Sequence, residues 1–303
     1  MKKNISVIIP AYKNTTLLLK NLQNNYLLLE NCEIVIVNDD PQTPLKPYLK
    51  KYPEIKIIEN IQNQGFSKAV NLGIKNATQD YLLLLNTDVV LQKIDFDRLL
   101  TIFSKNKELF ALSFYQKENN GIVSGKNQIY WQNNFFQHKR ATNLDAGITA
   151  WAEGGAGLFD KKKLLELGGF DAIYSPFYWE DIDLCYRAWK SGYTVLFDPE
   201  TKVDHQHEST IGKYFSQKIK TISLRNQFIF IWKNITDQEL INAHCKNLVK
   251  IYFSLLKDSG LSAGKSFFQA LLLLPKILEK RKEQIKTYRK SDKEILKMFK
   301  IKS

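Results

Sequence analysis

The chain has 303 residues, of which 44% are hydrophobic and 25% charged, and this composition excludes a largely disordered protein. The length suffices for one large domain with an appendage. Lysine and arginine exceed aspartate and glutamate by 13, so anionic partners are electrostatically permitted. The three cysteines, Cys32, Cys185 and Cys245, lie far apart without CxxC spacing, which argues against a disulfide framework or a zinc site and favours a reducing cytoplasm.

The first ninety residues alternate short apolar runs with helical patterns. Continuous Val, Ile and Leu runs predict strands at 5–12, 32–39, 55–60 and 80–88, and helices are expected from Thr15 and over 66–77. Strands that are apolar on both faces are typical of a parallel sheet covered by helices. The predicted fold class is therefore α/β, with a Rossmann-like, mostly parallel central sheet flanked by helices. Pro10 interrupts the first run and no cleavage site follows it, so this run is interpreted as a buried strand.

Polar residues follow several of these strands, at the sheet edge where ligands bind in open α/β folds. Residues 38–40, at the end of "VIVNDD", could accept hydrogen bonds from a nucleobase or a ribose. Residues 86–88, after "LLLL", offer oxygen ligands for a hard divalent cation. Gly65 precedes a helix whose first N–H groups could meet a phosphate. Taken alone, residues 86–88 are more typical of a simple turn than of a cation site, and a turn is also the alternative for residues 38–40.

Beyond residue 105 the pattern weakens, and 105–145 is expected to be a long loop or extra strands. The stretch "SPFYWEDIDLCYRAWKSG" at 175–192 then predicts a helix with carboxylates in its first turn, where the helix dipole favours them. Asp183 and Arg187 are four residues apart, which suits an ion pair on the helix surface. The buried stripe of this helix is expected to consist of Ile182, Cys185, Tyr186 and Trp189.

Six motifs, taken in order over about residues 5–210, resemble glycosyltransferase family 2, the nucleotide-sugar-dependent transferases with the GT-A fold. They are "SVIIPAY", "VIVNDD", "NQGFSKAVNLGIKNATQDYLLLLNTDV", "GGAGLFDKKKLLELGGFD", "WEDIDLCYRAWKSGYTVLFDP" and "VDHQHEST". The resemblance is greatest to the bacterial rhamnosyl- and galactofuranosyl-transferase-like branch. It implies a GT-A domain at 1–210, and the helical patterns that follow indicate a C-terminal appendage at 211–303.

The resemblance also implies roles for individual residues. Asp181 matches the general base that takes the proton of the acceptor hydroxyl, with Glu180 as the second candidate. Asp88 and His205 are expected to hold a divalent cation, Mn²⁺ or Mg²⁺, and Asn86 stands in the first place of the family's DxD element, where it is a weaker, neutral ligand.

The remaining implied contacts fall into two groups. Residues expected to bind the nucleotide sugar are Pro10, Ala11, Tyr12, Asp39, Asn63, Gly65, Phe66, Asn71, Asn86, Thr87 and Asp88. Those expected to contact the acceptor are Gly154, Gly155 and Trp179, the glycines by allowing a close approach to the backbone. His207 is interpreted as a loop histidine.

The function implied is that of an inverting glycosyltransferase. It would move a sugar from a nucleoside-diphosphate sugar to a hydroxyl of a glycan or lipid-linked acceptor, in bacterial cell-surface polysaccharide synthesis. The alternative is a catalytically weak, sugar-nucleotide-binding membrane scaffold. A sugar-nucleotide pyrophosphorylase is disfavoured because "PAYKN" has no glycine after the first strand.

The last 28 residues, 276–303, carry eleven Lys/Arg against four Asp/Glu. Their apolar residues recur at helical spacing: Ile277, Ile285, Tyr288, Ile295 and Phe299. Two alternatives remain open: a basic amphipathic tail peripheral on the inner face of the cytoplasmic membrane, or a helix packed on its own domain. Because the charge concentrates here and the acidic motifs repel phosphate, no nucleic-acid partner is expected.

Overall fold

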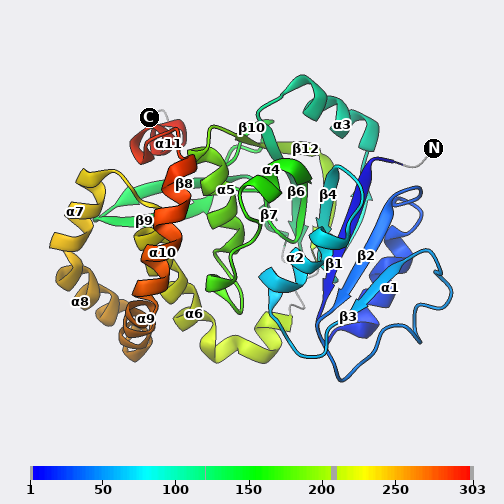
Figure 1. Cartoon of the computed structure of the whole chain (residues 1–303), viewed down its shortest axis with the longest axis horizontal. Helices are drawn as coiled ribbons and strands as arrows, with labels where there is room; N and C mark the ends of the chain where they lie inside the picture. The colour runs from blue at the N-terminus through cyan, green and yellow to red at the C-terminus, as the bar shows by residue number, and fades with distance from the viewer. Residues whose placement is uncertain (1–2, 120, 206–209, 301–303) are drawn as a thin grey trace.

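The computed structural model describes residues 3–119, 121–205 and 210–300. A central sheet lies beside a bundle of C-terminal helices, and the two parts share a core (Figure 1). The strands are β1 (Ile5–Ala11), β2 (Glu33–Asn38), β3 (Lys56–Glu59), β4 (Tyr81–Leu85), β5 (Val89–Lys93), β6 (Leu109–Glu118), β7 (Val123–Ser124), β8 (Asn127–Gln132), β9 (Phe135–Arg140), β10 (Gly147–Ile148), β11 (Ala156–Asp160) and β12 (Thr194–His205). The helices are α1 (Thr15–Asn25), α2 (Phe66–Asn76), α3 (Phe96–Lys105), α4 (Lys161–Glu166), α5 (Glu180–Lys190), α6 (Thr210–Asn234), α7 (Gln238–Lys246), α8 (Leu248–Ser259), α9 (Leu261–Leu272), α10 (Leu274–Gln284) and α11 (Asp292–Met298).

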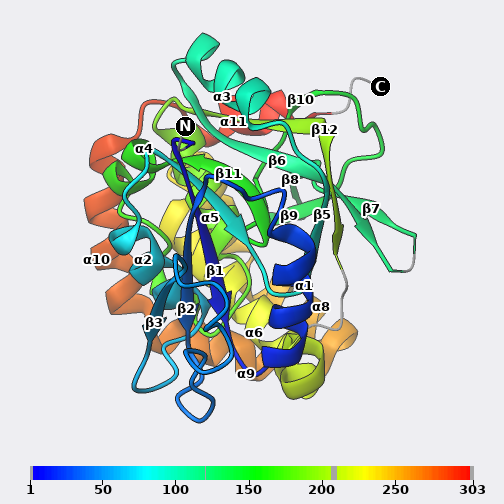
Figure 2. The same ribbon diagram turned by 90° about the vertical axis from the view of Figure 1, so that its right-hand side faces the viewer.

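The main sheet has the strand order β10-β12-β6-β11-β4-β1-β2-β3. Strands β1 to β4 pair in parallel, and β6 is parallel to β12, whereas β11 runs antiparallel between β4 and β6. The predicted α/β class with a mostly parallel central sheet is therefore confirmed. Because β1, β2 and β4 run in the same direction, their carboxyl ends share one edge, visible toward the bottom of Figure 1 and of the rotated view in Figure 2.

Helix α2 covers one face of this sheet as the apolar stripe predicted. Its buried residues are Ser67, Ala69, Val70, Gly73 and Ile74. Gly73 allows the closest approach, since a Cβ there would lie 2.4 Å from Ile8 Cγ2 on β1. A larger residue would force the helix away from the sheet.

The segment at 105–145, whose pattern was ambiguous, forms strands. It contributes β6 to the main sheet and the β8–β9 hairpin, in which Gln132 pairs with Phe135. The hairpin packs on α6 through aromatic contacts: the rings of Phe136 and Phe230 are 4.4 Å apart. These strands tie the C-terminal helices to the sheet.

After residue 210 the described chain is helical, as predicted, but the basic tail is not one continuous helix. It breaks into α10, a 3₁₀ turn at Ile285–Thr287 and α11. Ile277 and Ile295 are fully buried and Phe299 nearly so, with the Phe299 ring 5.5 Å from that of Trp189. Most of the apolar face expected of the tail therefore lies against the protein, which is the second of the two alternatives.

The lengths of the helices bear on whether the chain could cross a membrane. Among the described residues no single helix is long and apolar enough to do so. A pair made of Leu261–Leu272 and Leu274–Thr287, bent by 60°, meets the length and composition criteria only when its two helices are taken together.

Candidate active site

A cavity of about 310 Å³ opens at the carboxyl ends of β1, β2 and β4 and at the start of α5. Fifteen of the seventeen residues predicted for the site line it, although their sequence positions span 10 to 205. Those fifteen are Pro10, Ala11, Tyr12, Asp39, Asn63, Gly65, Phe66, Asn86, Thr87, Asp88, Gly154, Gly155, Glu180, Asp181 and His205. The structure places Asn71 and Trp179 elsewhere.

Asp39 positions the loop that leads into α2. Its carboxylate accepts hydrogen bonds from the backbone N–H of Gln64 at 2.8 Å and of Gly65 at 2.8 Å, and from Asn60 Nδ2 at 2.8 Å. The N–H of Gln64 also lies 3.1 Å from Oδ2, so both carboxylate oxygens are engaged by this loop, and Asp39 forms part of the cavity wall. Gly65 has a φ of +79°, a conformation that costs glycine little, and it sets the start of α2 beside the cavity.

Asp88 and His205 come together from the ends of two different segments. Asp88 follows β4 and His205 ends β12, and Asp88 Oδ1 lies 3.3 Å from His205 Nε2. The other ring nitrogen, Nδ1, lies 3.1 Å from Gln116 Oε1, so the imidazole is held on both sides. Burial disfavours the charged imidazole, but the hydrogen bond and charge of Asp88 outweigh it and raise the pKa of His205.

Gly155 lets Asn86 pack close to the backbone beside the imidazole of His205. A Cβ on Gly155 would lie 2.7 Å from Asn86 Nδ2 and 3.6 Å from His205 Cε1. Within the described ranges no group of three or more His, Cys, Asp or Glu residues could hold a metal ion by itself. One carboxylate and one imidazole nevertheless suit a cation whose remaining ligands are substrate phosphates and water, as is common for Mg²⁺.

Helix α5 starts with an unusual backbone that aims its first turn at the cavity. Tyr178 and Trp179 have φ values of +69° and +77°, which non-glycine residues seldom adopt. Asn226 on α6 holds this turn, since its Nδ2 lies 2.7 Å from the carbonyl oxygen of Tyr174, 3.0 Å from that of Phe177 and 2.9 Å from that of Tyr178. Glu180 and Asp181 consequently line the cavity from the helix N-terminus.

The two adjacent carboxyl groups differ in their surroundings. Burial and the charge of Asp181 raise the pKa of Glu180 to about 8, and Glu180 Oε2 has no hydrogen-bond partner among the described residues. Burial and the charge of Glu153 raise the pKa of Asp181 to about 6. At neutral pH Asp181 is therefore mostly ionised while Glu180 holds its proton, which suits the first to accept a proton and the second to donate a hydrogen bond.

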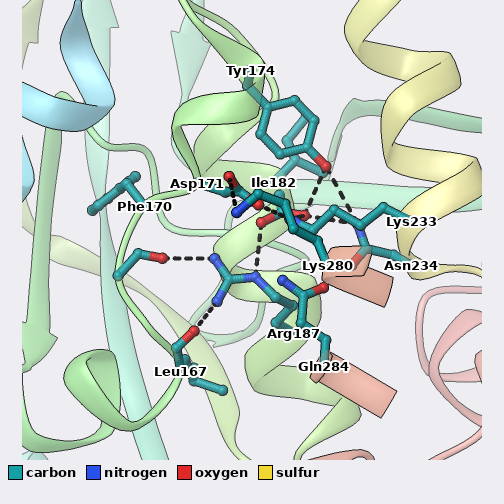
Figure 3. Close-up of polar contacts among 12 residues, drawn as sticks. Leu167, Phe170, Asp171, Tyr174, Ile182, Arg187, Lys233, Asn234, Lys280 and Gln284 are labelled. Atoms are coloured by element: carbon teal, nitrogen blue, oxygen red, sulfur yellow. Dashed lines mark hydrogen bonds and ion pairs between the residues drawn. The ribbon is translucent and has the colours of Figure 1, made fainter. Parts of the chain in front are cut away.

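The far side of α5 is fixed by a buried polar network rather than by a surface ion pair (Figure 3). The predicted pair exists, with Arg187 Nε 2.8 Å from Asp183 Oδ2, but Asp183 is completely buried and Arg187 is 2% exposed. The prediction of a surface pair was wrong because Lys233 on α6 reaches across from fifty residues away. Its Nζ lies 2.7 Å from both Asp171 Oδ2 and Asp183 Oδ1.

Two predicted contacts are corrected by the geometry. Trp179, expected against the acceptor, is 3% exposed, and its ring packs 5.3 Å from that of Phe230. Asn71 brackets the backbone of Phe170 instead of lining the cavity: Nδ2 donates to its carbonyl at 2.7 Å, and its N–H donates to Oδ1 at 3.0 Å. Besides Tyr12 and Phe66, the aromatic residues that line the cavity are Phe177 and Tyr178.

The site also contains residues that the motifs did not single out. Glu153 lines the cavity next to the glycine pair, and its charge raises the pKa of both Asp181 and His205. The sequence feature that could have identified Glu153 as a site residue is its position directly before "GGAG". Pro176 and Ala69 complete the wall, and His207 lies outside the described residues.

Comparisons with curated proteins point to one class of enzyme. The chain is 25% identical over 247 residues to poly-beta-1,6-N-acetyl-D-glucosamine synthase of Staphylococcus epidermidis, covering 78% of this chain and 59% of that protein. It is 20% identical over 224 residues to pre-mycofactocin glycosyltransferase of Mycobacterium tuberculosis, covering 71% of this chain and 45% of that protein. The chain thus spans about half the length of these relatives.

Solved structures show the likeness in fold. GalNAc-T7 with UDP, GalNAc and Mn²⁺ superimposes with a TM-score of 0.58 at 17% identity, over 77% of this chain and 48% of that one. The mannosyltransferase PcManGT from Pyrobaculum calidifontis, in complex with GDP-Man and Mn²⁺, superimposes with a TM-score of 0.54 at 14% identity. This match covers 95% of this chain and 86% of that one. Both support the GT-A fold expected from the motifs. The family model described as Glycosyl transferase family 2 matches residues 6–168, more than half of the sequence, and the chain belongs to this family.

Proposed function

We propose that this chain is an inverting glycosyltransferase that moves a sugar from a nucleoside-diphosphate sugar to a hydroxyl of a glycan or lipid-linked acceptor. Family membership supports the reaction class. The observation that carries the proposal is the meeting, in one cavity, of an ionised carboxylate at Asp181 with the Asp88 and His205 pair. The relative named a poly-beta-1,6-N-acetyl-D-glucosamine synthase supports a place in bacterial cell-surface polysaccharide synthesis.

In the proposed reaction the donor diphosphate lies beside Asp88 and His205. These residues would hold a divalent cation, Mn²⁺ or Mg²⁺, which when bound neutralises charge on the departing nucleoside diphosphate. Gly154 and Gly155 lie in the same cavity, where the absence of side chains lets Phe66 and Asn86 pack against their backbone. Asp39 and the loop that it orders form the side of the cavity proposed for the nucleoside.

Asp181 then acts on the acceptor. A sugar hydroxyl is a weak nucleophile, and a positioned base typically contributes about 10²–10⁴ in rate. Asp181 accepts the proton as that oxygen attacks the anomeric carbon in a single displacement, so the configuration at that carbon inverts. Glu180, protonated at neutral pH, donates a hydrogen bond in the same cavity. The elevated pKa of Asp181 makes it a stronger base than an exposed aspartate.

The experiment compares two neighbouring isosteric variants. Asp181→Asn is expected to lower transfer of labelled sugar into a glycan or lipid extract by about 10²–10⁴ while leaving sugar-nucleotide affinity unchanged. Glu180→Gln keeps a neutral hydrogen-bonding group and is expected to retain most of the activity. Equal loss of donor binding and turnover in Asp181→Asn would contradict the role of base, and NMR of the product's anomeric proton tests inversion.

The same measurements separate the transferase from its rival, a catalytically weak membrane scaffold that binds sugar nucleotides. A scaffold would bind the donor equally well in the wild-type protein and both variants, and any weak transfer would be the same in all three. Measurable wild-type transfer that Asp181→Asn abolishes therefore excludes the scaffold.

A further inference from the structure

Helices α8 and α9 carry a large apolar surface that the described part of the chain leaves uncovered. Six side chains form it, and we call them the α8–α9 face: Val249, Phe253, Leu261, Phe268, Leu271 and Leu272. Leu261 is 91% exposed and Leu272 is 82% exposed. The ring of Tyr252 lies 5.7 Å from that of Phe253 and 6.4 Å from that of Phe268, which joins the exposed side chains of the two helices. Exposed apolar patches on a folded protein mark interaction surfaces.

Lysines are interleaved with these apolar residues along both helices. On α8, Lys250 and Lys257 stand at helical spacing on either side of Phe253. On α9, Lys265 lies four residues after Leu261 and three before Phe268, which places all three on one stripe. Between residues 246 and 272 the chain has four lysines and a single carboxylate, that of Asp258. The face is therefore both apolar and basic.

Helices α8 and α9 pack against the rest of the described chain through their opposite sides. The exposed apolar residues are therefore not needed for these packing contacts. Ala263, Ser266 and Ala270 of α9 are buried, and Ser266 Oγ donates to the carbonyl of Thr221 on α6 at 2.9 Å. The rings of Tyr252 on α8 and Phe267 on α9 are 5.3 Å apart, which joins the two helices. The helices form a packed hairpin, one side of which the described chain does not cover.

The hairpin lies at the same height in the ribbon views as the strand ends that build the candidate active site. In both ribbon views α8 and α9 occupy the lower part, toward which the carboxyl ends of β1 and β2 also point (Figures 1 and 2). The cavity is built at those strand ends, by residues such as Pro10 and Asp39. Helices α8 and α9 therefore lie at the level of the strand ends that build the cavity.

We propose that the α8–α9 face binds an anionic lipid surface, with α8 and α9 lying in the headgroup region. Amphipathic helices of this composition bind membranes by burying apolar side chains and pairing lysines with anionic headgroups. A lysine between two apolar residues of one stripe can bury its stem with them and extend its ammonium group to a phosphate. The regular lysine spacing and the near absence of carboxylates favour lipid over a second copy, whose face would be equally basic.

The surface differs from the tail first considered for this role. Ile277, Ile295 and Phe299 of the tail are buried in the protein, whereas the α8–α9 face precedes the tail and points outward. The proposal does not depend on the reaction catalysed.

Flotation of the 303-residue chain with vesicles tests whether the α8–α9 face binds lipid. The protein is expected to float with vesicles of phosphatidylglycerol and phosphatidylcholine, to float weakly with phosphatidylcholine alone, and to be released by high salt. The double variant Leu261→Glu/Leu272→Glu should lower vesicle affinity by about tenfold or more. Leu27→Glu is the matched control, because Leu27 is also 82% exposed and follows α1, on the opposite side of Figure 1.

A second variant keeps the apolar side chains and removes charge only. Lys250→Gln/Lys265→Gln is expected to reduce the preference for phosphatidylglycerol without changing weak binding to phosphatidylcholine. Thermal unfolding of each variant checks that it is folded. The proposal is overturned if the double leucine variant floats as well as Leu27→Glu. It is also overturned if the wild-type protein fails to float with phosphatidylglycerol vesicles; a dimer seen by light scattering that the leucine variant dissociates would then assign the face to a second copy of the chain.

Discussion

The buried carboxyl group of Glu180 should make the stability of the protein fall as the pH rises. Its Oε2 atom has no hydrogen-bond partner among the described residues, and burial with the charge of Asp181 moves its pKa from 4.5 to about 8. Between these values the folded state holds a proton that the unfolded state has released. Because stability falls with pH wherever the folded state binds more protons, the loss begins near the lower value and ends near the upper one.

The magnitude follows from the shift. Each pKa unit corresponds to about 1.4 kcal/mol, so ionisation of the unfolded chain between the two pKa values lowers the free energy of unfolding by roughly 3 kcal/mol at about pH 7. The amide introduced by Glu180→Gln cannot titrate. The difference in stability between this variant and wild type should therefore grow by about that amount from acidic to neutral pH, in favour of the variant.

Urea denaturation of both proteins across this pH range, followed by circular dichroism, measures the difference directly. Subtracting the two curves removes the titration of groups that both proteins share. A difference that stays constant with pH would refute the reasoning, since it would mean that Glu180 ionises in the folded state as easily as in the unfolded chain.

Three further predictions concern packing, loop order and the cation. Gly73→Ala should lower the free energy of unfolding by about 1–3 kcal/mol, because the new Cβ would meet Ile8 Cγ2. The control Lys75→Ala, on the exposed side of the same helix, should change this free energy much less. Equal effects of the two substitutions would refute the close packing of α2 on the sheet. Asn226→Ala leaves the carbonyls of the turn before α5 without their donor, so it should lower both stability, by about 1–3 kcal/mol, and transfer; a fully active, equally stable variant would show that this clamp is dispensable. Asp88→Asn should raise the Mn²⁺ concentration needed for half-maximal transfer, and an unchanged requirement, or full activity in a chelator, would exclude this residue as a ligand.

Much of the site could be predicted because sheet topology brings strand ends together. Pro10 lies near the end of one strand, and Asp39 and Asp88 follow two others; the apolar runs of all three are evident in the sequence, and parallel pairing carries their carboxyl ends to one edge. The motif resemblance added Asp181 and His205, which arrive at that edge from distant segments. The fold class followed from the same runs.

The errors arose where a side chain's direction depends on tertiary partners. Trp179 stands beside the two carboxylates in the sequence, but its positive φ turns it into the core, which local spacing does not reveal. Asn71 lies on α2 near cavity residues, yet the loop at Phe170 takes up its amide. The ion pair on α5 is buried because Lys233 approaches from α6, a contact invisible in a window of one helix.

The central claim, that the cavity beside Asp88 and Asp181 binds a nucleoside-diphosphate sugar together with a divalent cation, can be tested before the acceptor is known. A thermal-shift panel of nucleoside diphosphates and sugar nucleotides, each with Mn²⁺ and with a chelator, measures it most directly, because a ligand that binds the folded state raises the unfolding temperature. The account predicts that at least one sugar nucleotide stabilises the wild-type protein with Mn²⁺, that the chelator reduces this shift, and that Asp181→Asn retains it. Absence of any shift across the panel, or a shift of the same size with the chelator, would contradict it.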